Sequence, residues 1–242
     1  MHEIIAIASF QEVLGTIDGG RILDVACGAG QSIELLVNSL GSWDRITGLD
    51  LSDKIMEEAK QKFRGDHFSF VTGTAQGLPF EPDSFDMVCL SKGLHHVPDP
   101  VAALNEMLRV VNQDGYLLVI EMYSDGLNAA QESQKMYHHL RVEVDNLLGV
   151  DHNNTFRKTE LLEIMMGTSL REVKVFEYSE PNLDPHNPEV INEYVEKMGA
   201  WIEELQDHPE SSSIKMKLKR VEGKMIADGF SKPPLLIFLG KK

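Results

Sequence analysis

The stretch ILDVACGAGQS, residues 22–32, constrains the fold more than any other part of the chain. Its first residues read as a short apolar strand, residues 27–30 as a tight turn, and the following residues up to Leu40 as a helix. Glycines in such a turn let the backbone approach a ligand closely, and the first helical turn offers free N–H groups. This strand, glycine turn and helix predict a nucleotide-type site.

Alternating strand and helix patterns continue through the first half of the chain. We expect strands over 45–50, 68–71, 85–90 and 116–122, with one helix capped by Ser52 and another opened by Pro100. Two later strands, over 171–178 and 234–239, bring the count to seven. Short alternation of this kind predicts an α/β fold: a doubly wound (Rossmann-like), mostly parallel seven-stranded sheet with helices on both faces.

The second half of the chain has a different pattern, in which long polar helical segments interrupt the strands. We expect one domain over residues 1–242, with helical insertions over 123–168 and 179–232 that form a cap and cover the substrate site. Eleven methionines occur, several of them in these insertions, where they either fill the core or mould around an apolar ligand.

Charge and cysteine content limit the partners and the compartment. A net charge of -15 argues against a nucleic-acid backbone or an anionic membrane as a partner. No apolar run is long enough for a membrane span, and the first residues lack the basic start of a secretion signal. Cys27 and Cys89 lie beside apolar runs, which indicates reduced thiols and a cytoplasmic protein. The sequence is compatible with a homodimer and does not determine the oligomeric state.

Asp50 ends the strand over 45–50, and a carboxylate at that point can accept hydrogen bonds from both ribose hydroxyls of a nucleoside. The alternative is an ordinary acid at a helix N-terminus, next to Ser52. NAD fits less well than other nucleosides, because Gly28 and Gly30 are not followed by the third glycine of the dinucleotide fingerprint.

Four stretches together resemble the successive motifs of class I S-adenosylmethionine-dependent methyltransferases: ILDVACGAGQS, ITGLDLS, LPFEPDSFDMVCLSKGLHHVPDP and LNEMLRVVNQDGYLLVIE. The resemblance covers residues 21–122 and is similar to the small-molecule enzymes of ubiquinone and menaquinone biosynthesis that methylate carbon. It implies S-adenosylmethionine as the cofactor and a small-molecule acceptor. The remaining half of the chain resembles no substrate subfamily.

The resemblance also assigns the cofactor-binding residues. The methionine part of the cofactor would face the loop of Asp24, Cys27, Gly28 and Gly30. The ribose would be held by Asp50, and the adenine would be contacted by Leu51 and by the stretch Thr74, Ala75 and Gln76. Ser91 would lie where cofactor and substrate meet. The family more often has an acid at the position of Thr74, which makes the adenine contacts less certain than the ribose contacts. Alternatively, Asp24 bonds its own turn, Leu51 is core and Gln76 is surface.

The implied reaction is in-line displacement of a methyl group from a sulfonium, for which the protein mainly aligns donor and acceptor. A base is needed only if the acceptor must lose a proton. His95 and His96 are the catalytic candidates, and packing of their loop is the structural alternative.

Residues of the first insertion are candidates for the acceptor site. Tyr123, His139, His152 and Arg157 would line a substrate pocket, with Arg157 able to pair with a carboxylate; the alternative is the polar surface of a cap. A metal held by His138, His139, Glu143 and His152 is not favoured, because no metal motif is present, and we predict no metal.

Three functions compete at this point. The first is a methyltransferase acting on a small organic molecule. The second is a non-catalytic module that binds S-adenosylmethionine or its demethylated product, S-adenosylhomocysteine. The third, an NAD-type oxidoreductase, fits the order of the motifs poorly. Binding of the three ligands separates the third function from the first two.

Overall fold

A computed structural model describes residues 3–181 and 184–242. Contacts between backbone atoms divide the chain into two compact units. The first, the sheet unit, comprises residues 1–121, 159–178 and 235–242. The second, the helical unit, comprises residues 122–158 and 179–234.

The sheet unit contains one sheet with the strand order β1-β7-β8-β6-β5-β2-β3-β4. Its strands are β1 (Ile4–Ile7), β2 (Arg21–Val25), β3 (Arg45–Asp50), β4 (Phe68–Thr72), β5 (Phe85–Ser91), β6 (Val111–Met122), β7 (Arg171–Tyr178) and β8 (Leu235–Lys241). Strands β1 and β7, β2 and β3, β2 and β5, β3 and β4, and β5 and β6 pair in parallel, whereas β7 and β8 are antiparallel.

The predicted mostly parallel sheet is therefore confirmed, but the count of seven strands is wrong by one. The additional strand, β1, is four residues long and pairs only with β7, at the edge of the sheet. Its IIAI sequence has no alternation of polar and apolar residues, and Ile5 is half exposed. Only the tertiary pairing makes this segment a strand.

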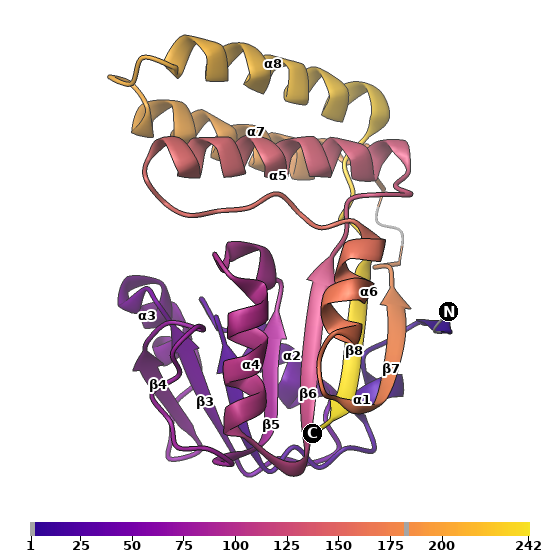
Figure 1. The fold of residues 1–242 in the computed structure, drawn as a ribbon. Coiled ribbons are helices and arrows are strands. Elements are labelled where there is room, and N and C mark those ends of the chain that lie inside the picture. The colour runs from indigo at the N-terminus through magenta and orange to yellow at the C-terminus, as the bar shows by residue number, and fades with distance from the viewer. Residues whose placement is uncertain (1–2, 182–183) are drawn as a thin grey trace. The chain divides into compact units, whose positions relative to one another are not determined.

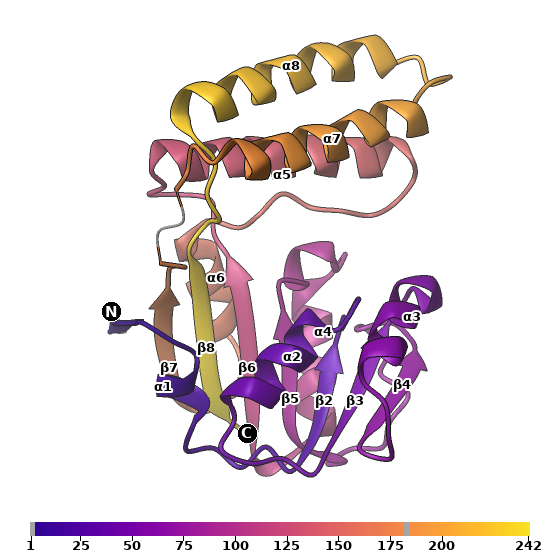
Figure 2. The same cartoon turned by 180° about the vertical axis from the view of Figure 1, so that it is seen from behind.

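Helices cover both faces of the sheet (Figures 1 and 2). Figure 1 shows α4 (Pro100–Val110) and α6 (Lys158–Met166) on one face, and Figure 2 shows α1 (Gln11–Leu14), α2 (Gln31–Ser39) and α3 (Asp53–Lys62) on the other. The expected starts of α3 and α4 are present. The Ser52 side chain accepts from the Ile55 N–H, and the side chain of Asp99, which precedes Pro100, accepts from the Ala102 N–H. These caps fix where the helices begin relative to the strand ends.

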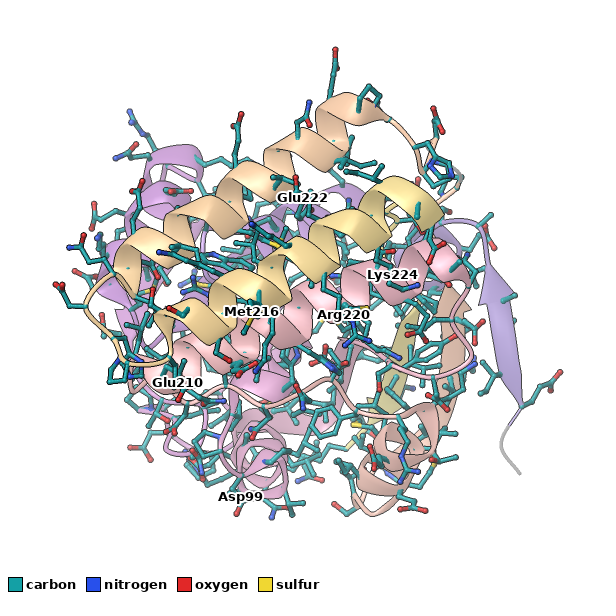
Figure 3. All side chains as sticks on the ribbon, turned by 90° about the horizontal axis from the view of Figure 1, so that it is seen from above. Asp99, Glu210, Met216, Arg220, Glu222 and Lys224 are labelled. Atoms are coloured by element: carbon teal, nitrogen blue, oxygen red, sulfur yellow. The ribbon has the colours of Figure 1, made fainter. Side chains whose placement is uncertain are left out.

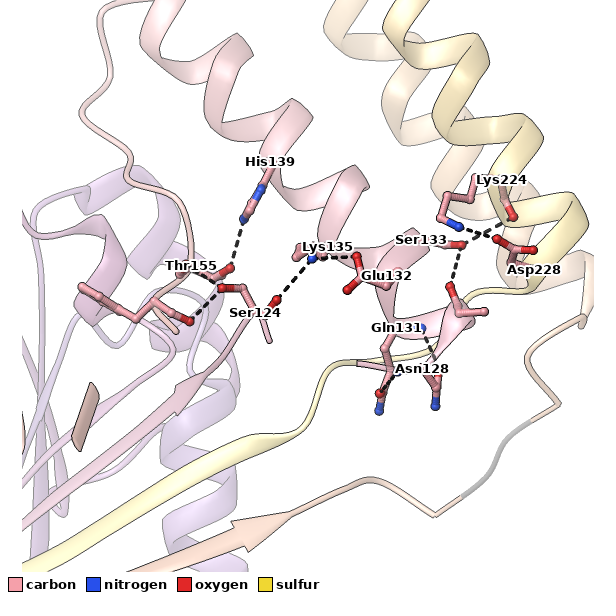
Figure 4. A network of polar contacts seen from close by, with 12 residues as sticks. Ser124, Asn128, Gln131, Glu132, Ser133, Lys135, His139, Thr155, Lys224 and Asp228 are labelled. Atoms are coloured by element: carbon pink, nitrogen blue, oxygen red, sulfur yellow. Dashed lines mark hydrogen bonds and ion pairs between the residues drawn. The ribbon is translucent and has the colours of Figure 1, made fainter. Parts of the chain in front are cut away.

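The helical unit is built from α5 (Ala129–Leu147), α7 (Pro188–Glu204) and α8 (Ser211–Asp228), which lie side by side in Figure 1. Asn128 and Gln131 form a capping box at the start of α5 (Figure 4). One apolar cluster, with Leu140, Met198, Trp201, Ile214 and Val221 among its members, joins the three helices. The unit therefore has a core of its own. Strand β8 follows the unit directly and returns the chain to the sheet.

Candidate functional site

The centre of the sheet unit contains a topological switch point. From β2 the chain continues to β3 and β4 on one side of the sheet, and then crosses to β5 and β6 on the other. Crossovers in opposite directions leave a crevice at the carboxyl ends of the central strands, where open α/β sheets bind ligands. The loop that follows β2, residues 26–30, lies at this point.

Asp24 is the most constrained residue of the candidate site. Its carboxylate is completely buried, and one oxygen accepts a hydrogen bond of 2.5 Å from the Ser32 hydroxyl at the start of α2. The other oxygen, Oδ1, has no partner in the described part of the chain. Burial raises the pKa of Asp24 to about 7, with the Ser32 hydrogen bond acting in the opposite direction and the charge of Asp50 adding to the rise. A buried acceptor without a partner indicates a donor that comes from a ligand.

Asp50 is held at the tip of β3 by two backbone donors. The Gly28 N–H donates to one carboxylate oxygen and the Ser52 N–H to the other, each at 2.9 Å. The Gly28 bond ties the glycine turn to the neighbouring strand, so both motifs face one place. Each oxygen keeps a second acceptor position, which is the chemistry that a pair of ribose hydroxyls requires.

Both glycines of the turn have left-handed backbones, but for different purposes. Gly30, at φ +89°, would bring a Cβ atom to 2.7 Å from the Phe63 ring, so close packing requires glycine there. Gly28, at φ +52°, would bring a Cβ atom no closer than 3.9 Å to any atom, so its surroundings are open. The side chain of Cys27 is buried in the core of the unit, and its thiol pKa is raised by burial. Only the backbone of Cys27 can therefore face a ligand.

Leu51 is 76% exposed, so the alternative that it is an ordinary core residue is wrong. An exposed leucine next to Asp50 fits a residue that packs on a flat apolar ligand group. The segment Thr74, Ala75 and Gln76 forms a tight turn after β4, in which the Thr74 hydroxyl accepts from the Gln76 N–H at 3.4 Å. The Gly73 N–H, just before this turn, donates to the Asp50 carbonyl at 3.0 Å, so the turn begins next to Asp50. Its predicted role at the adenine stays a prediction.

The two histidines after β5 lie in different environments. Ser91 ends β5, and His95 and His96 follow within a short 3-10 helix, Leu94–His96. His95 is buried, and its Nδ1 lies 3.0 Å from Oε2 of Glu121, which is buried as well. The same carboxylate oxygen accepts from the Leu94 N–H at 2.9 Å. His96 is exposed. A role for Glu121 was not predicted, although this residue ends the stretch LNEMLRVVNQDGYLLVIE.

The four acceptor-site candidates all belong to the helical unit. Tyr123 is buried, and the ammonium group of Lys158 lies 4.4 Å from the centre of its ring. Arg157 is exposed. His139 shares a hydrogen bond of 3.0 Å with Thr155, whose carbonyl accepts from the Ser124 hydroxyl (Figure 4). These contacts fasten residues 151–158 along α5.

His152 is oriented by a buried acid that the sequence did not reveal. Its Nδ1 lies 2.7 Å from Oδ2 of Asp145, and the Asn146 side chain bonds both the N–H and the carbonyl of His152. Burial works to raise the pKa of Asp145, but hydrogen bonds from His152 and Arg141 outweigh it and hold this pKa below its usual value. Asp145 is therefore ionised at neutral pH and fixes the tautomer of His152, with Nδ1 protonated. No local motif marks Asp145, because the pair forms only when residues 151–158 fold back on α5.

The residues around the switch point fit S-adenosylmethionine. Asp24 and Asp50 supply negative charge for an ammonium group and acceptors for hydroxyls, and Leu51 supplies an exposed apolar surface. The buried Asp24 carboxylate offers an acceptor to an ammonium group but no donor to a pyrophosphate, which counts against a dinucleotide.

Comparisons with known proteins agree with this geometry. Residues 23–119 match the family model described as a methyltransferase domain. The chain is 35% identical over 125 residues to a demethylmenaquinone methyltransferase of Staphylococcus aureus (strain MRSA252). The aligned residues make up 51% of this chain and 52% of that protein. A protein of the same name from Staphylococcus haemolyticus is 35% identical over 120 residues, 49% of this chain and 50% of its own. The chain thus spans about half the length of the curated relatives it matches.

Solved structures share the fold over nearly the whole chain. The YcgJ protein from Bacillus subtilis superposes with a TM-score of 0.62 and 20% identity, covering 96% of this chain and 95% of its own. A second match is phosphoethanolamine N-methyltransferase 2 of Haemonchus contortus, solved in complex with phosphomonomethylethanolamine and S-adenosylhomocysteine. It superposes with a TM-score of 0.58 and 20% identity, covering 96% of this chain and 51% of its own. At this identity the likeness concerns the fold. Residues 23–119 of this chain therefore match a methyltransferase domain, and the chain shares its α/β fold with these solved structures.

Proposed function

We propose that this protein transfers a methyl group from S-adenosylmethionine to a small organic acceptor by in-line displacement. The observation that carries the proposal is the buried Asp24 carboxylate, whose Oδ1 has no partner among the described residues, at the switch point of the sheet. The family of the domain supports it.

The residues of the chain bind and orient the donor. Asp24 would accept from the ammonium group of the methionine part, Asp50 from the ribose hydroxyls, and Leu51 would pack on the adenine. When bound, S-adenosylmethionine supplies an electrophilic methyl group on a sulfonium, so the protein need not supply a nucleophile. Alignment of the acceptor is then the main catalytic task, worth about 7–11 kcal/mol in favourable cases.

For the acceptor side, we propose that Tyr123, His139, His152 and Arg157 of the helical unit take part in recognition. If the acceptor must lose a proton, His152 is the better prepared of the buried histidines. Its hydrogen bond to Asp145 leaves Nε2 as the acceptor nitrogen. His96, which is exposed, is the second candidate, whereas the contacts of His95 with Glu121 support a role in loop packing.

The acceptor class follows the relatives only as a proposal. The proteins that match half of this chain are named demethylmenaquinone methyltransferases, and a demethylmenaquinone is accordingly the first acceptor to test.

Three calorimetric titrations of the purified protein test the cofactor, with S-adenosylmethionine, S-adenosylhomocysteine and NAD as ligands. We expect micromolar binding of the first two and none of NAD. Binding of NAD alone would refute the proposal. A protein that binds the first two but methylates none of a panel of acceptors would be the non-catalytic binding module.

A matched pair of variants tests the site itself. Asp50→Ala removes the acceptor of the Gly28 and Ser52 N–H groups and should weaken binding by roughly 2–3 kcal/mol, or about 30-fold to 150-fold. Asp66→Asn, at an exposed acid elsewhere in the sheet unit, should leave binding unchanged. Equal binding by both variants would count against the assigned ribose site.

The remaining expectations concern location and partners. No helix in the described residues combines the length and apolar character that crossing a bilayer would require. We propose a cytoplasmic protein on the ground that Cys27 and Cys89 are both unbridged, and a protein without a nucleic-acid partner on the ground of its charge.

A further inference from the structure

Two neighbouring helices of the helical unit carry opposite charge. Helix α7 contains five glutamates and one lysine, whereas α8 contains four lysines and one arginine against one glutamate and one aspartate. A chain with a net charge of -15 thus concentrates positive charge on one helix. Such a concentration indicates an interaction surface.

Most of these charges are exposed, and only some are neutralised within the unit. On α8, Lys217 pairs with Glu143 and Lys224 with Asp228, whereas Lys215, Lys219 and Arg220 are exposed and pair with no described residue. Lys219 and Arg220 lie on the side of α8 opposite its buried residues Ile214, Val221 and Met225, with Lys215 at the border.

The acidic helix shows the complementary pattern. On α7, Glu193 pairs with Lys197 and Glu204 with Arg141. Glu189, Glu196 and Glu203 are exposed, pair with no described residue and repeat every seven residues, which puts them in one row opposite the buried face of the helix. Helix α8 therefore has three exposed cations, and α7 three exposed anions, that pair with no described residue.

Exposed apolar side chains accompany the charges. Met216 is 70% exposed and Ile226 is 63% exposed, and Figure 3 shows Met216 on the outward side of α8. Such side chains add apolar area to a surface whose main feature is its charge. On α7 the exposed side between Glu196 and Glu203 carries Gly199 and Ala200, which leave room for a bulkier side chain.

We propose that α7 and α8 together form a self-complementary surface, on which a second copy of this chain docks with its α8 against α7 and its α7 against α8. A two-fold axis parallel to the helices produces this arrangement, so that the acidic row on α7 of each copy faces the unpaired cations on α8 of the other copy. Met216 and Ile226 would be covered in the contact. The acidic row of α7 would repel an anionic membrane beside α8, which favours a second copy over a lipid surface.

A charge-swap experiment tests this arrangement. We expect the full chain to be dimeric at micromolar concentration in sedimentation equilibrium. The variant Lys215→Glu/Lys219→Glu should raise the dissociation constant at least about tenfold, and so should Glu196→Lys/Glu203→Lys. Glu189 is left unchanged because it lies in the first turn of α7, where an acid stabilises the helix. Mixed in equal amounts, the two variants should form a heterodimer that native mass spectrometry resolves.

Two controls keep the test decisive. Arg45→Glu/Lys174→Glu reverses two exposed cations of the sheet unit and should leave the dimer intact. Thermal unfolding should show that each variant is folded, since every substituted side chain is exposed. A monomeric parent chain, a dimer that both charge reversals leave unchanged, or folded variants that do not associate when mixed would each overturn the proposal. Binding of the parent chain to phosphatidylglycerol vesicles, lost in Lys215→Glu/Lys219→Glu, would instead assign the surface to a membrane and overturn it as well.

Discussion

Ser32 and Asp24, eight residues apart in the sequence, are joined by a buried hydrogen bond of 2.5 Å across the turn between β2 and α2. The bond satisfies one carboxylate oxygen and leaves Oδ1 without a partner in the described residues. A carboxylate that is half satisfied and completely buried is unfavourable in its charged form until a cation arrives. Asp24 therefore links its own protonation to ligand binding.

The first prediction concerns the pH dependence of binding. Burial first of all raises the pKa of Asp24 to about 7, so below that pH the carboxyl is mostly neutral and cannot attract an ammonium group. We expect affinity for S-adenosylmethionine to rise with pH up to about 7 and then to level off, in calorimetric titrations at several pH values. Asp24→Asn should remove this dependence and weaken binding at pH 8 by about 1.5–3 kcal/mol. An unchanged pH profile in this variant would exclude Asp24 as the titrating group.

The same group predicts how stability changes with pH. The pKa is higher in the folded protein than the ordinary value of 3.8, so between these two pH values the folded state binds more protons than the unfolded state. The free energy of unfolding should therefore fall as pH rises from about 4 to about 7, by an amount on the order of 4 kcal/mol for this group. Urea unfolding at pH 4.5 and pH 8 measures the change, and Asp24→Asn should reduce it clearly.

The two glycines of the turn should respond differently to alanine. Gly30→Ala combines a left-handed backbone with a Cβ atom 2.7 Å from Phe63, and we expect a loss of about 2–4 kcal/mol in the free energy of unfolding. Gly28→Ala has the backbone strain without the clash, and about 1–2 kcal/mol should be lost. Urea unfolding compares the two. A larger loss for Gly28→Ala than for Gly30→Ala would contradict the packing described for this turn.

Leu51 should matter for binding and not for folding. Because the side chain is 76% exposed, Leu51→Ala should change the free energy of unfolding by less than about 0.5 kcal/mol. If the leucine packs on the adenine, the substitution should weaken binding of S-adenosylhomocysteine by about 1–2 kcal/mol. Val101→Ala, at an exposed apolar side chain of α4, is the matched control and should leave binding unchanged. Equal affinities of parent and Leu51→Ala would remove Leu51 from the site.

Glu121 should prove necessary for folding of the segment after β5. It is buried, its Oε2 accepts from the Leu94 N–H, and the same oxygen lies 3.0 Å from Nδ1 of His95, so Glu121→Ala removes this carboxylate from both groups. We expect a loss of about 1–3 kcal/mol in thermal or urea unfolding, because a buried hydrogen-bond acceptor is removed. His96→Asn, at an exposed ring next to His95, should cost less than about 0.5 kcal/mol. A stable Glu121→Ala protein would show that the pair contributes little to the fold.

Periodic, local signals allowed much of the sheet unit to be predicted from the sequence. The apolar run of β2, the Ser52 cap of α3 and the Pro100 start of α4 each depend on residues within one turn or strand, and the structure confirms them. The turn of Gly28 and Gly30 and the acid Asp50 were likewise recognisable, because short βα units bring consecutive strand ends to one edge of the sheet.

The sequence alone did not reveal relationships between residues far apart. Strand β1 exists because β7 offers an edge to pair with, and its own sequence has no strand period. Asp145 and His152 meet because a segment without secondary structure folds back along α5, and Glu121 reaches His95 across 26 residues. Tertiary structure also decided that Oδ1 of Asp24 is left without a partner and that opposite charges lie on neighbouring helices. Local propensity determines the helices and strands. Burial and pairing between distant residues determine which polar groups have partners within the chain and which are left for a ligand or a second copy to bind.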